Sequence, residues 1–120
     1  MPPRRRTDPE AGRDAVAAWR TDPPAAARDV VATAVRYTLE ELAARAPGNS
    51  TEVRVPPFGV VQCVPGPRHT RGTPPNVVET DAATWLAVAC GDLTWADALG
   101  SGRLRASGER ADLSALLPLA

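Results

Sequence analysis

The chain has 120 residues, 14 arginines, no lysine and 14 acidic residues, which give a formal net charge of +0. This length fits one domain with a single core. A neutral chain has no overall field that favours nucleic acid, so none is expected as a partner. No apolar run approaches the ~20 residues of a transmembrane helix, and the basic start lacks the apolar stretch of a secretory signal. We therefore expect a cytoplasmic protein without a transmembrane segment.

The two cysteines are predicted to be buried free thiols. Cys63 and Cys90 lie far apart in apolar surroundings, and neither is part of a CxxC pair. His69 is the only histidine that could accompany them, so a structural zinc site is not expected, and neither is any other metal or cofactor. A nucleophilic cysteine needs a lowered pKa. Cys63 lies near His69 in sequence but within an apolar strand, and Cys90 ends a helix, so the sequence predicts no enzyme.

The N-terminal third is predicted to contain a tail and two helices. Residues 1–10 are rich in proline and arginine, so we expect a disordered tail, followed by a single domain over residues 11–120. A short helix is predicted at Asp14–Arg20, before the break at Pro23-Pro24. A longer helix is predicted at Ala25–Arg45, because its apolar residues recur at helical spacing. That apolar stripe consists of Val31, Val35, Leu39 and Leu42.

Three strands and then more helices are predicted after this long helix. The strands are expected at Glu52–Val55, Val60–Val64 and Asn76–Thr80. Asp81 and Gly91 are typical ends of a helix at Ala82–Cys90. A helix at Trp95–Gly100, a strand at Arg103–Ser107 and a last helix at Ala111–Leu117 follow. This order predicts the α+β class, with one mixed, mainly antiparallel sheet and helices packed on one face.

The C-terminal half, Thr84–Leu119, resembles the sterol carrier protein family through the segment WLAVACGDLTWADALGSGRLRASGERADLSALLPL. It has a helix that ends at Gly91, a second short helix, a Ser101-Gly102 turn and a strand followed by Gly108. The middle segment, with its RHTRGTPPN loop, is similar to a bacterial subgroup, so the resemblance covers roughly residues 25 to 119. The resemblance implies about five strands, an apolar cavity between sheet and helices that holds a lipid, sterol or fatty acyl-CoA, and no cofactor.

The loop Pro65–Asn76 is the most unusual stretch of the sequence. It holds Arg68, His69 and Arg71 among prolines and glycines, which fix the backbone at low entropic cost. These side chains suit a phosphate or carboxylate, because guanidinium binds such groups in a bidentate manner. The alternative is that they tie the loop to the body of the domain.

Three further residues complete the candidate ligand-binding set. Trp85 and Trp95 are core residues or cavity walls, and Asn76 closes the loop or contacts a ligand. The sequence therefore predicts a non-catalytic carrier of an apolar or amphipathic small molecule, with the loop at the mouth of the cavity. The alternative is a small protein-interaction module with a filled core that docks a partner through the same loop. A homodimer is left open.

Overall fold

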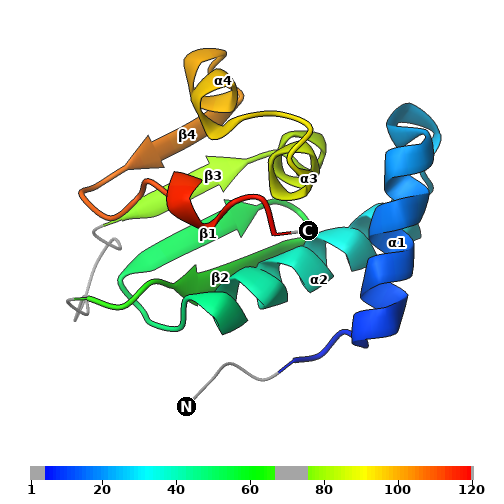
Figure 1. Ribbon diagram of the computed structural model, residues 1–120, viewed down its shortest axis with the longest axis horizontal. Helices are drawn as coiled ribbons and strands as arrows, with labels where there is room; N and C mark the ends of the chain where they lie inside the picture. Colours follow the sequence, from blue (N-terminus) through cyan, green and yellow to red (C-terminus); the bar gives the residue numbers. More distant parts are fainter. Residues whose placement is uncertain (1–4, 67–75, 120) are drawn as a thin grey trace.

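The computed structural model describes residues 5–66 and 76–119 and confirms the α+β class (Figure 1). Its elements occur in the order α1 (Pro9–Thr21), a 3₁₀ turn (Pro23–Ala25), α2 (Arg28–Arg45), β1 (Thr51–Val55), β2 (Gly59–Cys63), β3 (Val77–Thr80), α3 (Ala82–Cys90), α4 (Trp95–Gly100), β4 (Leu104–Ser107) and a second 3₁₀ turn (Ser114–Leu116). None of the helices in the described ranges is both long and apolar enough to span a bilayer.

The sheet is mixed and mainly antiparallel, as predicted, with the strand order β2-β1-β3-β4. The pairs β1–β2 and β3–β4 are antiparallel, and β1–β3 is parallel. The described residues form four strands, where the family resemblance implied about five. The register places Val53 beside Val61 and Val78, so these apolar side chains share the face that the helices cover.

The other face of the sheet is polar. Glu79 of β3 pairs with Arg105 of β4 at 3.1 Å and with Arg54 of β1 at 3.8 Å, and Arg54 also contacts Glu52. Opposite charges on neighbouring strands are typical of a sheet face in contact with water. The opposite face, which carries Val53 and Val78, therefore forms the core.

The core lies between the sheet and the helices α2 and α3. Trp85 of α3 is fully buried, and its indole N–H donates to the hydroxyl of Thr38 on α2 at 2.8 Å. That hydrogen bond satisfies the one polar group of the tryptophan. The large side chains with at most 1 % of their surface exposed include Leu39, Leu42, Val53, Val55, Val78, Leu86, Leu104 and Leu113. Together they form one contiguous apolar cluster.

The caps predicted for α3 and α4 are present. The Asp81 carboxylate accepts a hydrogen bond from the Thr84 N–H at 2.8 Å, and Gly91 ends α3 in the left-handed conformation with φ 83°. The Thr94 hydroxyl accepts from the Asp97 N–H at the start of α4 at 3.1 Å. Both helices begin and end at the residues that the sequence indicated.

Two boundaries differ from the prediction at the ends of the chain. α1 begins at Pro9 instead of Asp14, because the Asp8 carboxylate accepts from the Ala11 N–H at 3.0 Å and Pro9 suits the first helical position. Of the residues expected in the tail, Pro9 and Glu10 are the first two of α1, and residues 5–8 lie directly before it. The predicted helix at Ala111–Leu117 is wrong in extent and is only a 3₁₀ turn. Leu117 precedes Pro118 and is extended, as a residue before proline prefers.

Candidate functional site

The predicted site residues fall into two groups in the structure. Arg68, His69 and Arg71 lie outside the described residues. Asn76, Trp85 and Trp95 are described and lie on three different segments: Asn76 precedes β3, Trp85 is on α3 and Trp95 is on α4. That they contact one ligand stays a prediction. Trp95 is half-buried on α4, and Trp85 belongs to the core.

The side chain of Asn76 joins two loops. Its amide nitrogen donates to the Ser50 carbonyl at 2.7 Å, and its amide oxygen accepts from the Arg110 N–H at 2.9 Å. The residue is 6 % exposed. Through these two hydrogen bonds the Asn76 side chain closes a turn, which is one of its two predicted roles. The other role, a contact with a ligand, stays a prediction.

A cavity of about 360 Å³ lies between α1, α2, α3 and the C-terminal segment, and we name it the helical pocket. In Figure 1, α1 lies at the right-hand end of the molecule, and the C-terminal segment ends between α3 and α2. The volume is within the range typical of small-molecule sites, about 300–1,000 Å³. The pocket is lined by Arg13, Val16, Ala17, Arg20, Tyr37, Thr38, Glu41, Arg45, Ala89, Cys90 and Leu119.

Helical periodicity explains why two helices supply most of this lining. Residues 13, 16, 17 and 20 of α1 are separated by three or four positions, so they share one face. The lining residues of α2, from Tyr37 to Arg45, recur with similar spacing. The two helices approach closely at Gly12, where a Cβ atom would collide with the Tyr37 ring. Glycine at this position therefore lets α1 form a wall of the pocket.

The floor of the pocket is apolar. Ala89, Cys90, Leu119 and Val16 are each at most 9 % exposed. Thr38 is the polar exception, but its hydroxyl accepts from Trp85 and lies 2.8 Å from the Ala34 carbonyl of its own helix. Its hydrogen-bonding capacity is used within the protein, so a ligand at the floor meets mainly apolar surface.

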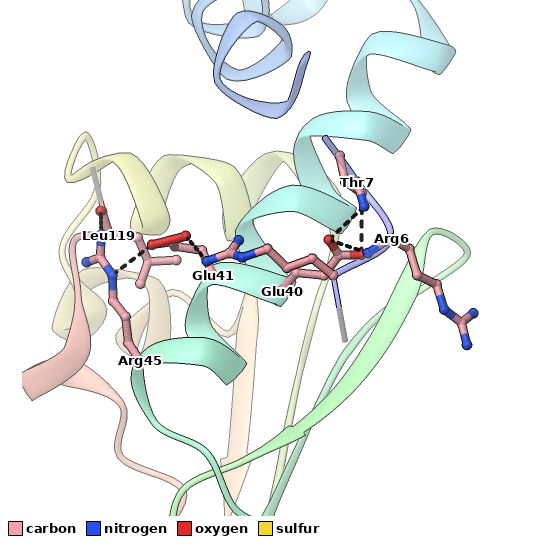
Figure 2. Close-up of polar contacts among 7 residues, drawn as sticks. Arg6, Thr7, Glu40, Glu41, Arg45 and Leu119 are labelled. Carbon is pink, nitrogen blue, oxygen red and sulfur yellow. Dashed lines mark hydrogen bonds and ion pairs between the residues drawn. The ribbon is translucent and has the colours of Figure 1, made fainter. Parts of the chain in front are cut away.

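The rim of the pocket carries charge. Arg20 forms a bidentate pair with Asp92, at 2.7 and 3.0 Å. Glu41 accepts from Arg5 at 2.8 Å and from Arg45 at 3.2 Å. Arg45 also donates to the Leu119 carbonyl at 2.5 Å, as Figure 2 shows, which joins the C-terminal segment to α2.

Glu41 stays ionised at this rim. Its partial burial acts to raise the pKa, but the hydrogen bonds and positive charges of Arg5 and Arg45 outweigh that effect. The pKa of Glu41 therefore lies below its ordinary value. At neutral pH the carboxylate offsets part of the surrounding positive charge.

The N-terminal arm, residues 5–7, is fastened to α2 beside the pocket (Figure 2). The N–H groups of Arg6 and Thr7 donate to Glu40 at 3.3 and 3.0 Å, and the Thr7 hydroxyl donates to the same carboxylate at 3.3 Å. Arg5 reaches Glu41 of the next helical position. Successive glutamates of α2 thus hold the arm that leads into α1.

A second depression, of about 600 Å³, lies between α2 and the β1–β2 hairpin. The N-terminal arm, Arg36 and Glu40 contribute polar groups to it, and Phe58 and Val61 contribute apolar ones. It lies between a helix and the sheet, where the family resemblance placed the cavity. Its lining is more polar than that of the helical pocket, which makes the helical pocket the better match for an apolar chain.

Neither cysteine is prepared for nucleophilic chemistry. Burial raises the pKa of Cys63 to about 11. Burial also raises the pKa of Cys90, and the opposing charge of Arg20 does not offset it. Both side chains are buried free thiols, as predicted, and both stay protonated at neutral pH. Among residues 5–66 and 76–119, no cluster of three or more metal-ligating side chains occurs.

Sequence reasoning did not find the helical pocket. Its walls come from segments around residues 13–20, 37–45, 89–90 and 119, whose proximity is a property of the tertiary structure. One local signal was available: Arg13 and Arg20 flank Val16 and Ala17 on one face of a helix.

Comparison with known families gives one match over most of the chain. A family model described as "Bacterial SCP ortholog" matches residues 27–119. The matched region begins just before α2 and includes the whole sheet, α3 and α4. A comparison with curated proteins gives no match.

Proposed function

We propose a function on the basis of this match, which shows that the chain belongs to the bacterial SCP ortholog family. The function is the binding of an apolar or amphipathic small molecule, such as a lipid, in the helical pocket, without catalysis. The observation that carries the proposal is the pocket itself, with its apolar floor at Ala89, Cys90 and Leu119. The family resemblance supports the class of ligand.

The energetics suit a single aliphatic chain. Burial of apolar surface contributes ~25 cal/mol per Å². A ligand that buries on the order of 300 Å² would therefore gain roughly 7 kcal/mol before the costs of association. The charged rim would contact water and the polar end of the ligand, while the apolar floor would hold the chain.

The chemistry of the site supports binding in place of catalysis. The thiol of Cys90 lies at the floor with a raised pKa. The Thr38 hydroxyl is already bonded to Trp85. Among residues 5–66 and 76–119, neither group has the basic partner that activates a nucleophile.

Native mass spectrometry of the purified protein, followed by organic extraction, tests the proposal. We expect a co-purifying or added aliphatic ligand at near one equivalent per chain. The variant Ala89→Trp, which places a large side chain at the floor, should abolish retention, and the exposed control Ala83→Trp should not. A mass of the protein alone, unchanged after incubation with mixed lipids and acyl-CoAs, would contradict carrier function and favour the protein-interaction alternative.

A further inference from the structure

The helical pocket is only partly built by the family region. The family match begins at residue 27, and α1 spans Pro9–Thr21, so α1 precedes the match. Yet α1 supplies Arg13, Val16, Ala17 and Arg20 to the pocket. The site as a whole is therefore a feature of this chain that the family match does not cover.

The packing of α1 shows that this helix is a fixed wall. Val16 is 9 % exposed and Trp19 is 4 % exposed. One end of the helix is held through the N-terminal arm, where Arg5 contacts Glu41, and the other end through the pair of Arg20 with Asp92. Apolar contact along the middle and ion pairs near both ends fix the position of the lining residues.

The charges around the rim do not cancel. Four guanidinium groups, those of Arg5, Arg13, Arg20 and Arg45, lie at the rim or pair with its carboxylates. The carboxylates that pair with them are Glu41 and Asp92. The rim therefore has an excess of positive charge, which favours a negatively charged ligand group.

Arg13 differs from the other arginines of the rim. Arg20 and Arg45 are held by carboxylates, whereas the described residues give Arg13 no carboxylate partner. Arg13 is exposed, and one helical turn separates it from the buried Val16 of the same wall. A ligand with its chain on the apolar floor would place its polar end near the guanidinium of Arg13.

We propose that α1 completes the helical pocket and that Arg13 selects a ligand with an anionic end, a carboxylate or a phosphate monoester on one aliphatic chain. This inference rests on the proposed function, because it names the ligand class of the same pocket. A planar guanidinium with a free hydrogen-bonding edge binds either anion in a bidentate manner. Arg5 and Arg45 share the single carboxylate of Glu41, so this group keeps one net positive charge that adds long-range attraction.

Isothermal titration calorimetry with three ligands of equal chain length tests the inference. The probes are decanoate, decyl phosphate and the uncharged decan-1-ol, each below its aggregation limit. The wild-type protein should bind at least one anion roughly tenfold or more tightly than the alcohol, as expected for a charge-assisted hydrogen bond. The anion that binds more tightly shows whether the pocket prefers a carboxylate or a phosphate monoester.

Two matched variants separate a local role of Arg13 from a general effect of charge. Arg13→Gln should lose roughly tenfold in anion affinity and keep its affinity for decan-1-ol. Arg103→Gln, an exposed arginine outside the pocket, removes the same charge and should bind all three ligands as the wild type does. Circular dichroism before each titration checks that both variants are folded.

The outcomes distinguish this inference from the proposed function. Equal wild-type affinity for the alcohol and both anions would overturn the selection by Arg13 and leave the binding function standing. Equal loss in Arg13→Gln and Arg103→Gln would also overturn it, because the effect would then be general electrostatics. If none of the three ligands binds the wild type, the proposed function and the inference both fall.

Discussion

The hydrogen bond between Trp85 and Thr38 gives the sharpest prediction about stability. It joins α3 to α2 in the core, where Trp85 is fully buried and Thr38 is 4 % exposed. Replacement of Thr38 by valine keeps the shape of the side chain but removes the acceptor of the indole N–H. A buried donor without a partner costs about 1–3 kcal/mol.

The expected change in melting temperature follows from the size of the chain. The entropy of unfolding is ~2.1 cal/mol/K per residue, which gives roughly 0.25 kcal/mol/K for this length. Thr38→Val should therefore lower Tm by about 4–12 °C. Thermal unfolding followed by circular dichroism measures this shift.

Thr33→Val is the matched control. Thr33 is half-buried on the same helix and is not the partner of Trp85, and threonine and valine have similar helix propensities. The control should stay within about 2 °C of the wild type, which corresponds to ~0.5 kcal/mol. If Tm falls no further in Thr38→Val than in Thr33→Val, the hydrogen bond to the indole does not contribute to stability as expected.

Four further predictions concern other contacts. Gly12→Ala should destabilise the protein by about 1–3 kcal/mol in urea unfolding, despite the better helix propensity of alanine, because the new Cβ meets the Tyr37 ring; a gain in stability would contradict the close approach. Asn76→Ala should cost about 1–3 kcal/mol, since it removes two hydrogen bonds at a buried position, and wild-type stability would show that these bonds are dispensable. Cys63 should react with a thiol reagent at pH 8 only after denaturation, because its pKa is raised to about 11; rapid labelling of the native protein would be contrary evidence. The pKa of Glu41 in the folded state lies below its ordinary value of 4.5, so its ionised form stabilises the fold above pH 4.5, and this contribution is lost as the pH falls through the folded-state pKa. Glu41→Gln should therefore lower the free energy of unfolding at pH 7 but not in strong acid. An equal loss at both pH values would exclude the ion pairs as the cause.

Local sequence signals were sufficient for α3, α4 and the sheet. Asp81 and Gly91 mark the ends of α3 through side-chain and backbone geometry that depends on neighbouring residues alone. Strand positions followed from short apolar runs between turns, and the pairing of β1 with β3 adds the parallel contact that makes the sheet mixed. Local propensity and tertiary structure agree in these elements.

The differences arise where a contact distant in sequence decides the structure. Residues 5–7 have a composition typical of a disordered tail, but Glu40 and Glu41 hold them against α2. The apolar residues Leu113 and Leu116 suggested a terminal helix, whereas Pro118 stops it after one turn and Leu119 donates its N–H to Ala89. The sequence of neither segment indicates which distant residues it contacts.

The candidate site could be predicted only in kind. The sequence predicted an apolar cavity between sheet and helices with Arg68 and Arg71 at its mouth, and these two residues lie outside the described ranges. The helical pocket is also mainly apolar, but other arginines line it, Arg13, Arg20 and Arg45. The location could not be predicted, because the pocket lies where α1, α2 and α3 converge. Convergence of helices depends on packing, and in the structure Gly12 is the position that lets α1 approach Tyr37.

The most direct test of binding in the helical pocket is an NMR titration of the ¹⁵N-labelled protein with decanoate. Binding in this pocket should cause saturable shifts of the backbone amides of Val16, Tyr37, Ala89 and Leu119 and leave amides of the polar sheet face, such as Glu79, unchanged. Shifts confined to the sheet, or none at saturating ligand, would contradict it.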